Sequence, residues 1–327
     1  MKPLFSINNH MLNRIVEISK VIGNLEVQVE RSCKSRTGNV IKSLHSSLAI
    51  ENNSLSVEQI TDIIDGKRVL GNPREIKEVK NAYDAYEEIL NLNPYSQKDF
   101  LYAHALLTKG IVHISGQYRY KDVGIFDSSG NVIHMGARPP FIKDLMDDLF
   151  HWGVNDDTPE LIKSCVFHYE IETIHPFEDG NGRMGRLWQT VILSKWNPIF
   201  AWIPIETMIY EHQEAYYEAL RVADKENDSS AFIEFMLDII LKTLIAYKKS
   251  DKVSDKIHEG LTTVENSIFQ LLAKYLRVHK TITTIQASKL IQKANPTTRR
   301  YLAKFVEVGL MEAHGENRNR TYSLKNK

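Results

Sequence analysis

Residues His175 to Arg186 read HPFEDGNGRMGR, an order of residue types that no packing requirement of a helix or strand calls for. Gly180 and Gly182 permit a tight turn and bring bare backbone N–H groups close to a ligand. The helix that we expect from Arg183 to Leu193 would direct the positive end of its dipole at the same point. The segment therefore predicts a binding site for an anion.

The charged residues of this segment indicate that the anion is a polyphosphate. Arg183 and Arg186 are three residues apart, so both guanidinium groups can extend from one face of the helix. Glu178 and Asp179 would be repelled by phosphate unless a cation lies between, and Mg²⁺ is usually held by one or two carboxylates plus phosphate oxygens. Histidine is the side-chain type whose ordinary pKa lies near neutrality, which suits His175 to accept a proton from a nucleophile.

Simpler interpretations of the segment explain less. Gly180 to Gly185 match the GxGxxG pattern of dinucleotide-binding loops, and Glu206 follows about 20 residues later. The apolar run from Phe200 to Ile205 contains Pro204, however, and no series of alternating strands and helices surrounds it. A plain loop between helices explains the glycines but not the arginine pair, and a purely structural His175 explains neither.

The segment resembles the signature of the Fic family: histidine, any residue, phenylalanine, any residue, an acid, Gly-Asn-Gly-Arg, any two residues and arginine. Every fixed position is filled. The resemblance implies a mainly α-helical core that transfers AMP from ATP to a Ser, Thr or Tyr hydroxyl of a target protein or of itself. It also implies that His175 is the catalytic base, that Asp179 holds Mg²⁺ and that Phe177 packs into the core. The implied nucleotide-binding residues are Gly180, Asn181, Gly182, Arg183, Met184, Gly185 and Arg186.

Residues Ser47 to Asn52 resemble the inhibitory motif of the family, which is Ser or Thr, three residues, Glu, then Gly or Asn. The resemblance implies an inhibitory helix over 41–52 in which Ser47 and Glu51 carry the motif. Glu51 would pair with Arg186 and so occupy the partner that the γ-phosphate of ATP needs. The protein would then be an autoinhibited adenylyltransferase. Removal of AMP from a modified protein remains an alternative function.

A second segment resembles the flap of the family, a hairpin that covers the active site. Gln117 to Arg119 precede it, and turn-forming residues from Asp127 to Asn131 separate two short apolar runs, so we expect a hairpin over about 117–136. The family analogy implies that its edge aligns the target peptide by strand addition. The implied flap residues are Val123, Gly124 and Ile125.

Tyr216 and Tyr217 resemble the adenine side of the nucleotide site in the family. Asp224 stands seven residues after Tyr217, where an asparagine is common in family members, and this departure weakens the match. Neighbouring tyrosines on a helix are also typical of a half-buried core. We expect both tyrosines to bind the nucleotide.

The composition is that of an ordinary globular protein with one large and one small domain. The chain has 327 residues, 43% of them hydrophobic, and its 41 basic residues balance its 41 acidic residues. This balance excludes a global attraction to nucleic acid or membrane. Cys33 and Cys165 are too few for a disulfide framework, and residues Met1 to Phe5 lack a signal-peptide core. We expect a cytoplasmic protein.

The most apolar stretch, Phe232 to Tyr247, does not predict a membrane span. Glu234, Asp238 and Lys242 recur in it every four residues, as on the solvent face of an amphipathic helix. Apolar residues also recur at helical spacing through most of the chain before the motif. Helices are expected over Met11–Gly23, Ile41–Ile50, Ser56–Gly66, Arg74–Leu92, Ser96–Ile111 and Pro140–Trp152.

We divide the chain into an N-terminal helical region over 1–95, a catalytic core over 96–250, a linker over 251–260 and a small domain over 261–327. The sequence of residues 261–327 predicts three helices followed by a hairpin, and this order resembles a winged helix. Its expected elements are helices over Thr263–Tyr275, Thr284–Ala294 and Pro296–Val308, and strands over Leu310–Ala313 and Arg320–Leu324.

In a winged helix that binds DNA, the third helix reads a groove of the duplex. Four residues near the start of this helix and two residues of the hairpin would face the DNA, but three acidic residues dilute the basic surface. Docking of a protein or a second copy of the chain is therefore as well supported as DNA binding, and a homodimer is left open. These residues are Thr297, Thr298, Arg299, Arg300, Arg318 and Arg320, with Glu307, Glu312 and Glu316 as the acids.

Two classes of function remain at this point. The first is a protein adenylyltransferase that uses ATP and Mg²⁺ and is restrained by its own helix. The second is a regulator whose core serves as a nucleotide sensor and whose C-terminal domain binds DNA or a partner protein. The complete motif from His175 to Arg186 favours the enzyme.

Overall fold

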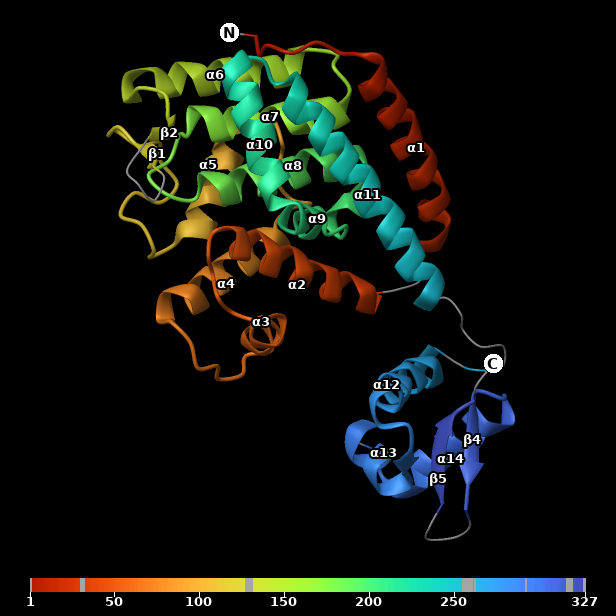
Figure 1. The fold of residues 1–327 in the computed structure, drawn as a ribbon. Coiled ribbons are helices and arrows are strands. Elements are labelled where there is room, and N and C mark those ends of the chain that lie inside the picture. The colour runs from red at the N-terminus through yellow and green to blue at the C-terminus, as the bar shows by residue number, and fades with distance from the viewer. Residues whose placement is uncertain are drawn as a thin grey trace. The chain divides into compact units, whose positions relative to one another are not determined.

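The structure is a computed structural model that describes residues 2–29, 33–126, 132–254, 261, 263–291, 293–315 and 320–325. Most of these residues are α-helical, which confirms the expected fold class. The contacts divide the chain into two units, Met1–Lys248 and Lys249–Lys327, each with its own hydrophobic core. Figure 1 shows the helices and strands of both units.

The helices expected from periodic apolar residues are all present in the first unit, but their ends differ by up to eight residues: α2 begins at Cys33 and ends at Ile50, so Glu51 and Asn52 follow the helix. Four further helices, α7, η1, α9 and α10, were not among the expected ranges. The elements of this unit are α1 (Asn9–Val29), α2 (Cys33–Ile50), α3 (Val57–Ile64), α4 (Pro73–Glu87), α5 (Gln97–Thr108), β1 (Gly124–Phe126), β2 (Val132–Met135), α6 (Pro139–Asn155), α7 (Glu160–Ile174), α8 (Asn181–Trp196), the 3-10 helix η1 (Pro198–Ala201), α9 (Ile205–Glu211), α10 (Gln213–Glu226) and α11 (Ser230–Ser254).

Helices α7 and α8 form the centre of the first unit. Both are buried along nearly their whole length, and α5 and α6 pack against them. Because α7 is buried on almost every side, its sequence has no polar stripe to mark the helical period. This explains why the periodicity of the sequence did not predict α7.

An aromatic cluster attaches the loop between α7 and α8 to this core. Phe177 is fully buried and stacks on His104 with ring centroids 3.6 Å apart, and it lies 5.3 Å from Phe100. Trp188 in α8 packs edge-on against Phe100 at 5.0 Å, and its indole N–H donates to the carbonyl of Pro94 at 3.0 Å. The expected position of Phe177 in the core is therefore confirmed.

The expected hairpin is present in the residues that the structure describes. Strands β1 and β2 are antiparallel, with Gly124 opposite Met135, and the register shifts between Ile125 and Phe126. The expected turn from Asp127 to Asn131 lies outside the described residues. The hairpin therefore extends from the segment between α5 and α6.

The second unit has the expected order of helices and strands with one addition, the short strand β3. Its strands form an antiparallel sheet in the order β3-β5-β4. The expected linker begins too early, because α11 continues through 251–254, and residues 255–260 lie outside the described residues. The elements are α12 (Thr263–His279), β3 (Ile282–Thr283), α13 (Thr284–Ile291), α14 (Asn295–Glu307), β4 (Met311–His314) and β5 (Thr321–Leu324).

The start of α14 does not present all four residues that were expected to face DNA. Thr298 is fully buried, and its hydroxyl donates to the carbonyl of Ala294 at 3.1 Å. Arg299 and Arg300 are exposed, whereas Glu316 and Arg318 lie outside the described residues. The expectation for Thr298 is wrong, because this side of the helix packs against the domain core.

Among the described residues, no helix combines the length and the apolar character that a membrane span requires. The stretch from Phe232 to Tyr247 lies within α11, which packs its apolar side into the core of the first unit.

A buried histidine in α7 connects α7, α8 and α10. His168 Nδ1 lies 2.7 Å from Gln189 Oε1, and its Nε2 lies 2.9 Å from the hydroxyl of Tyr216. Because an amide oxygen only accepts hydrogen bonds, Nδ1 carries a proton. Burial lowers the pKa of His168 to about 3.

This burial predicts that His168 makes stability depend on pH. In the unfolded chain a histidine has a pKa of about 6.5, so between pH 6.5 and pH 3 the unfolded state binds more protons. The stabilising effect of the neutral ring is complete above pH 6.5 and is lost as the pH falls. Between pH 7.5 and pH 5.5 the wild type should lose on the order of 1 kcal/mol more unfolding free energy than His168→Gln.

Urea unfolding of both proteins at the two pH values measures this difference. Burial also lowers the pKa of His104, to about 4, and raises the pKa of Glu170, to about 7. Both groups are present in both proteins, so their effects cancel in the comparison. Equal losses of stability in the two proteins would show that His168 does not titrate as inferred.

Candidate functional site

The motif from His175 to Arg186 forms the end of α7, a tight loop and the start of α8. His175 ends α7 in the left-handed conformation with φ 53°, and Gly180 has φ 90° immediately before α8. The side chain of Asn181 closes the loop, because it accepts from the N–H of Phe177 and donates to its carbonyl, both at 2.9 Å. The helix begins at Asn181, two residues earlier than expected, and its N-cap residue is Gly180.

The glycines and Met184 have different roles in this loop. Gly180 supplies a left-handed backbone, whereas Gly182 lies in the first turn of α8, and a Cβ atom on it would overlap Oε1 of Glu51. A Cβ atom on Gly185 would lie 2.7 Å from Cδ2 of His168, so this glycine allows α8 to pack closely on α7. Met184 is fully buried, so its side chain faces the core and not a ligand.

Arg186 is the most enclosed charge of the site, with 1% of its side chain exposed. It donates from Nη2 to Glu51 Oε1 at 2.7 Å and to the carbonyl of Ser47 at 3.0 Å, and from Nε to the hydroxyl of Ser47 at 3.1 Å. Burial alone would lower the pKa of Arg186, but Glu51 and the neighbouring Tyr216 and Glu172 raise it above its ordinary value. The ion pair expected between Glu51 and Arg186 is therefore present in the structure.

Arg183 and Asp179 form a second charged cluster, together with two residues of α4 that the sequence did not predict. Arg183 Nη2 donates to Asp179 Oδ1 at 2.8 Å, and Arg74 Nη2 donates to Asp179 Oδ2 at 3.0 Å. Glu78 lies 3.4 Å from Nε of Arg74 and 3.8 Å from Nη1 of Arg183. Nε of Arg183 is buried without a hydrogen-bond partner among the described residues, so this guanidinium has a donor to offer to an anion.

His175 has a defined protonation pattern. Its Nδ1 lies 3.2 Å from the carbonyl oxygen of Glu172. A carbonyl only accepts, so Nδ1 donates to it, and in the neutral ring the lone pair then lies on Nε2. This is the arrangement that a general base requires.

The chain that leaves the flap contacts the end of α7 directly. The N–H of Ala137 donates to the carbonyl of Ile174 at 3.1 Å, and the N–H of Gly136 donates to the carbonyl of Val123 at 3.2 Å. Val123 and Gly124 are partly buried, and the side chain of Ile125 lies outside the described residues. The base of the hairpin is therefore held beside His175.

His104 attaches the start of this segment to the other end of the loop. Its Nδ1 accepts from the N–H of Gly116 at 2.9 Å, so its Nε2 carries the proton and donates to the carbonyl of Asp179 at 3.0 Å. Its lowered pKa keeps this tautomer neutral at physiological pH. Sequence reasoning did not find His104, because nothing in its local pattern distinguishes it from a core residue.

The structure separates the roles of the tyrosines expected to bind adenine. Tyr216 is 1% exposed, and its hydroxyl lies between His168 and Glu172 Oε1, the latter at 3.2 Å. Tyr217 is 48% exposed and is accessible to a ligand. Asp224 accepts from the hydroxyl of Tyr169 at 3.1 Å and so connects α10 to α7. Tyr216 supports the site from inside the core, whereas Tyr217 lies at the surface.

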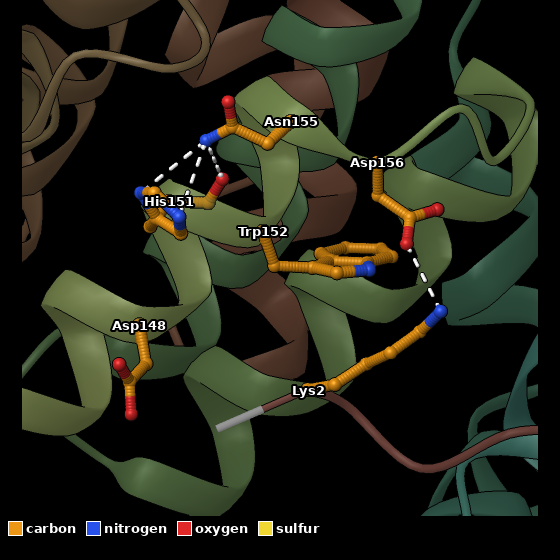
Figure 2. Close-up of a pocket in the computed structure, with 6 residues that line it drawn as sticks. All are labelled: Lys2, Asp148, His151, Trp152, Asn155 and Asp156. Carbon is orange, nitrogen blue, oxygen red and sulfur yellow. Dashed lines mark hydrogen bonds and ion pairs between the residues drawn. The ribbon is translucent and has the colours of Figure 1, made fainter.

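A surface pocket of about 330 Å³ lies away from the motif, over the C-terminal half of α6 (Figure 2). Lys2 Nζ and Asp156 Oδ2 form an ion pair at 3.0 Å on one side of it. No motif residue lines this pocket, so it has no part in the chemistry of the loop. Its lining residues are Lys2, Asp148, His151, Trp152, Asn155 and Asp156.

Comparison with known proteins identifies the same segment. The Fic/DOC family matches residues 94–193. The chain is 31% identical over 188 residues to a probable protein adenylyltransferase of Aquifex aeolicus, covering 55% of this chain and 53% of that protein. It is 27% identical over 220 residues to the protein adenylyltransferase Fic of Culex quinquefasciatus, covering 63% of this chain and 41% of that protein. The chain thus spans about half the length of these curated relatives.

Two solved structures extend the comparison. A fragment of Fic-1 from C. elegans shares the fold, with a TM-score of 0.59 and 21% identity over 75% of this chain and 73% of that one. A Fic family protein from Desulfovibrio desulfuricans aligns with 100% of this chain and 99% of its own length, at 37% identity and a TM-score of 0.78. With the complete motif and this match over the whole length, the chain belongs to the Fic family.

Proposed function

We propose that the protein transfers AMP from ATP to a hydroxyl group of a target protein and of itself. The observation that carries this proposal is the position of His175, whose Nε2 lone pair lies on the same loop as the glycine turn and two buried arginines. The names of the relatives from Aquifex aeolicus and Culex quinquefasciatus support the same reaction. The unpartnered Nε of Arg183 supports an anionic ligand at this place.

In this reaction His175 Nε2 takes the proton of the attacking hydroxyl. The hydroxyl oxygen forms a bond to the α-phosphorus of ATP, the bond between that phosphorus and the bridging oxygen to the β-phosphate breaks, and pyrophosphate leaves. Arg183, Arg186 and the first N–H groups of α8 stabilise the negative charge on the leaving group. The protein itself forms no covalent intermediate, so positioning and charge account for its contribution.

The residues present are compatible with Mg²⁺ at Asp179. The described residues contain no group of three or more metal-binding side chains, so phosphate oxygens would complete the coordination. A magnesium ion would neutralise phosphate charge there. Both oxygens of Asp179 accept hydrogen bonds from arginines, so Arg74 would compete with a cation for this carboxylate.

We further propose that Glu51 keeps the enzyme inactive. Its carboxylate lies against Gly182 and pairs with Arg186, where the γ-phosphate would otherwise bind. Breaking a buried ion pair without a replacement is costly, so Arg186 retains Glu51 until another anion takes its place. Removal of AMP is a second candidate function, because a carboxylate beside the motif loop can orient a water molecule.

A nucleotide sensor would bind ATP at the same loop without transferring AMP. Label from ATP with radioactive α-phosphate, but not from ATP with radioactive γ-phosphate, would appear on the protein only if AMP is transferred.

The first prediction from the proposed function concerns Glu51. Glu51→Gly should increase AMP self-modification by up to about 100-fold, the gain expected if the inhibited arrangement holds about 99% of the molecules. Intact mass spectrometry after incubation with Mg-ATP measures the added AMP. Glu226→Gly is the matched control, because Glu226 is an exposed glutamate at the end of α10. Equal rates for wild type and Glu51→Gly would exclude the inhibitory role.

The second prediction concerns His175. In the Glu51→Gly background, His175→Ala should lower the rate of AMP transfer by about 10²- to 10⁴-fold, because a positioned base typically contributes that much. The affinity for Mg-ATP, measured by calorimetry, should remain within a few-fold. The exposed His151 provides the control substitution His151→Ala. Transfer that survives in His175→Ala would show that another group accepts the proton.

The third prediction concerns Arg74. Arg74→Gln should lower the magnesium concentration needed for half-maximal ATP binding by about 2- to 5-fold, because a partly exposed ion pair is worth up to about 1 kcal/mol. Calorimetric titrations of ATP at several magnesium concentrations, in the Glu51→Gly background, measure this shift. Lys80→Gln removes an exposed cation from the same helix and serves as the control. An unchanged magnesium dependence would show that Arg74 does not compete for Asp179.

A further inference from the structure

Arg119 lies between the flap and the C-terminal end of α7, and only 4% of the residue is exposed. Its guanidinium forms hydrogen bonds to backbone carbonyl oxygens and to no carboxylate in the described chain. Burial lowers the pKa of Arg119 below its ordinary value, so this position is a costly one for a cation. An apolar side chain in this position would avoid that cost. We therefore attribute the presence of Arg119 here to the hydrogen bonds that its guanidinium makes.

These hydrogen bonds join three separate parts of the site. Nε of Arg119 donates to the carbonyl of His175 at 2.7 Å. Nη1 donates to the carbonyl of Lys121 at 2.7 Å, on the chain that enters the flap. Nη2 donates to the carbonyl of Ala137 at 2.6 Å, on the chain that leaves it, and to that of Ile174 at 3.4 Å. One planar group therefore fixes the base and both ends of the flap relative to each other.

The backbone around Arg119 reinforces the same connection. The N–H of Arg119 donates to the carbonyl of Pro176 at 2.9 Å, directly after His175. Gly136 lies against the guanidinium, and a Cβ atom there would come within 2.6 Å of Nη2 of Arg119 and 2.9 Å of Cβ of His175. The flap and the base are thus in contact at a place where no side chain fits.

His175 needs such support because of its backbone conformation. Its φ of 53° is unusual for a residue with a Cβ atom and persists only where neighbouring groups hold it. The hydrogen bonds from Arg119 fix the peptide groups on both sides of His175, and they favour the end of α7, where a cation offsets the helix dipole. The same conformation places Nδ1 on the carbonyl of Glu172 and so leaves the lone pair on Nε2.

We propose that Arg119 is a positioning residue that sets the orientation of the His175 imidazole and its distance from the flap. A target hydroxyl held along the flap then meets Nε2 in the correct place. This inference rests on the proposed AMP transfer. Arg119 does not touch the reacting atoms. Its role would be to align His175 with the flap, which presents the target.

The test compares Arg119→Met, Arg119→Lys and the control Arg138→Met in the Glu51→Gly background. Arg138 is exposed and forms no side-chain cap bond at the start of α6, near the same end of the flap. At saturating Mg-ATP the self-modification rate of Arg119→Met should fall by about 10- to 100-fold, because small misplacements of a reacting group cost that much. The Kd for Mg-ATP should stay within twofold, Arg119→Lys should recover part of the rate, and Arg138→Met should behave like the parent.

A second readout follows the imidazole itself. NMR of protein labelled with ¹⁵N-histidine reports which ring nitrogen carries the proton, and the parent should show His175 protonated at Nδ1. Arg119→Met should lose this single tautomer. This measurement does not depend on AMP transfer, so it separates a failure of the inference from a failure of the proposed function.

An unchanged rate and tautomer in Arg119→Met would overturn the inference. A parallel loss of rate and of Mg-ATP affinity would also overturn it, because a general structural role would affect both. If Arg119→Met does not fold, the same criteria apply to Arg119→Lys, which keeps the charge but not the planar set of donors. If the parent transfers no AMP, the proposed function fails and the tautomer alone decides the role of Arg119.

Discussion

The site depends on a buried cation that must always have an anionic partner. Arg186 is enclosed by α2, α7 and α8, and its charge cannot be left unpaired without a large cost. In the present structure Glu51 is that partner. If a phosphate of ATP pairs with Arg186 in place of Glu51, the carboxylate of Glu51 and the substrate compete for the same cation. Replacing Glu51 by phosphate would then cost less free energy than removing Glu51 and leaving Arg186 without an anion. The ion pair could therefore act as a switch.

Helix α4 connects this switch to the carboxylate proposed to hold magnesium. Directly after Glu51, the side chain of Asn53 donates to Glu78 at 3.0 Å, and Glu78 also lies near Arg183. From the same helix Arg74 donates to Asp179. Helix α2 and the residue after it contact the Arg186 cluster, whereas the chain that follows them contacts the Arg183 cluster. A shift of α2 would disturb the residues that cover Asp179 as well as those that cover Gly182.

How much of this was predictable depends on how local each interaction is. The motif loop could be predicted, because its glycines, arginines and histidine are neighbours in the sequence and their chemistry needs that order. The ion pair of Glu51 with Arg186 followed from family resemblance alone. The contacts of Arg119 could not be predicted, because their partners lie in three segments that only the fold brings together. Tyr216 was expected to meet the nucleotide, but the core around His168 encloses it.

The two carboxylates near Arg186 differ in a way that makes release of the inhibitory one feasible. Glu172 belongs to the buried helix α7, where its neighbours include Tyr216, whereas Glu51 follows the last turn of α2 and is 41% exposed in its side chain. Both raise the pKa of Arg186. When Glu51 leaves, Glu172 continues to stabilise the guanidinium, and water can solvate the departing carboxylate. In the proposed mechanism the exposed Glu51 would therefore exchange with phosphate, while the less exposed Glu172 would remain beside Arg186.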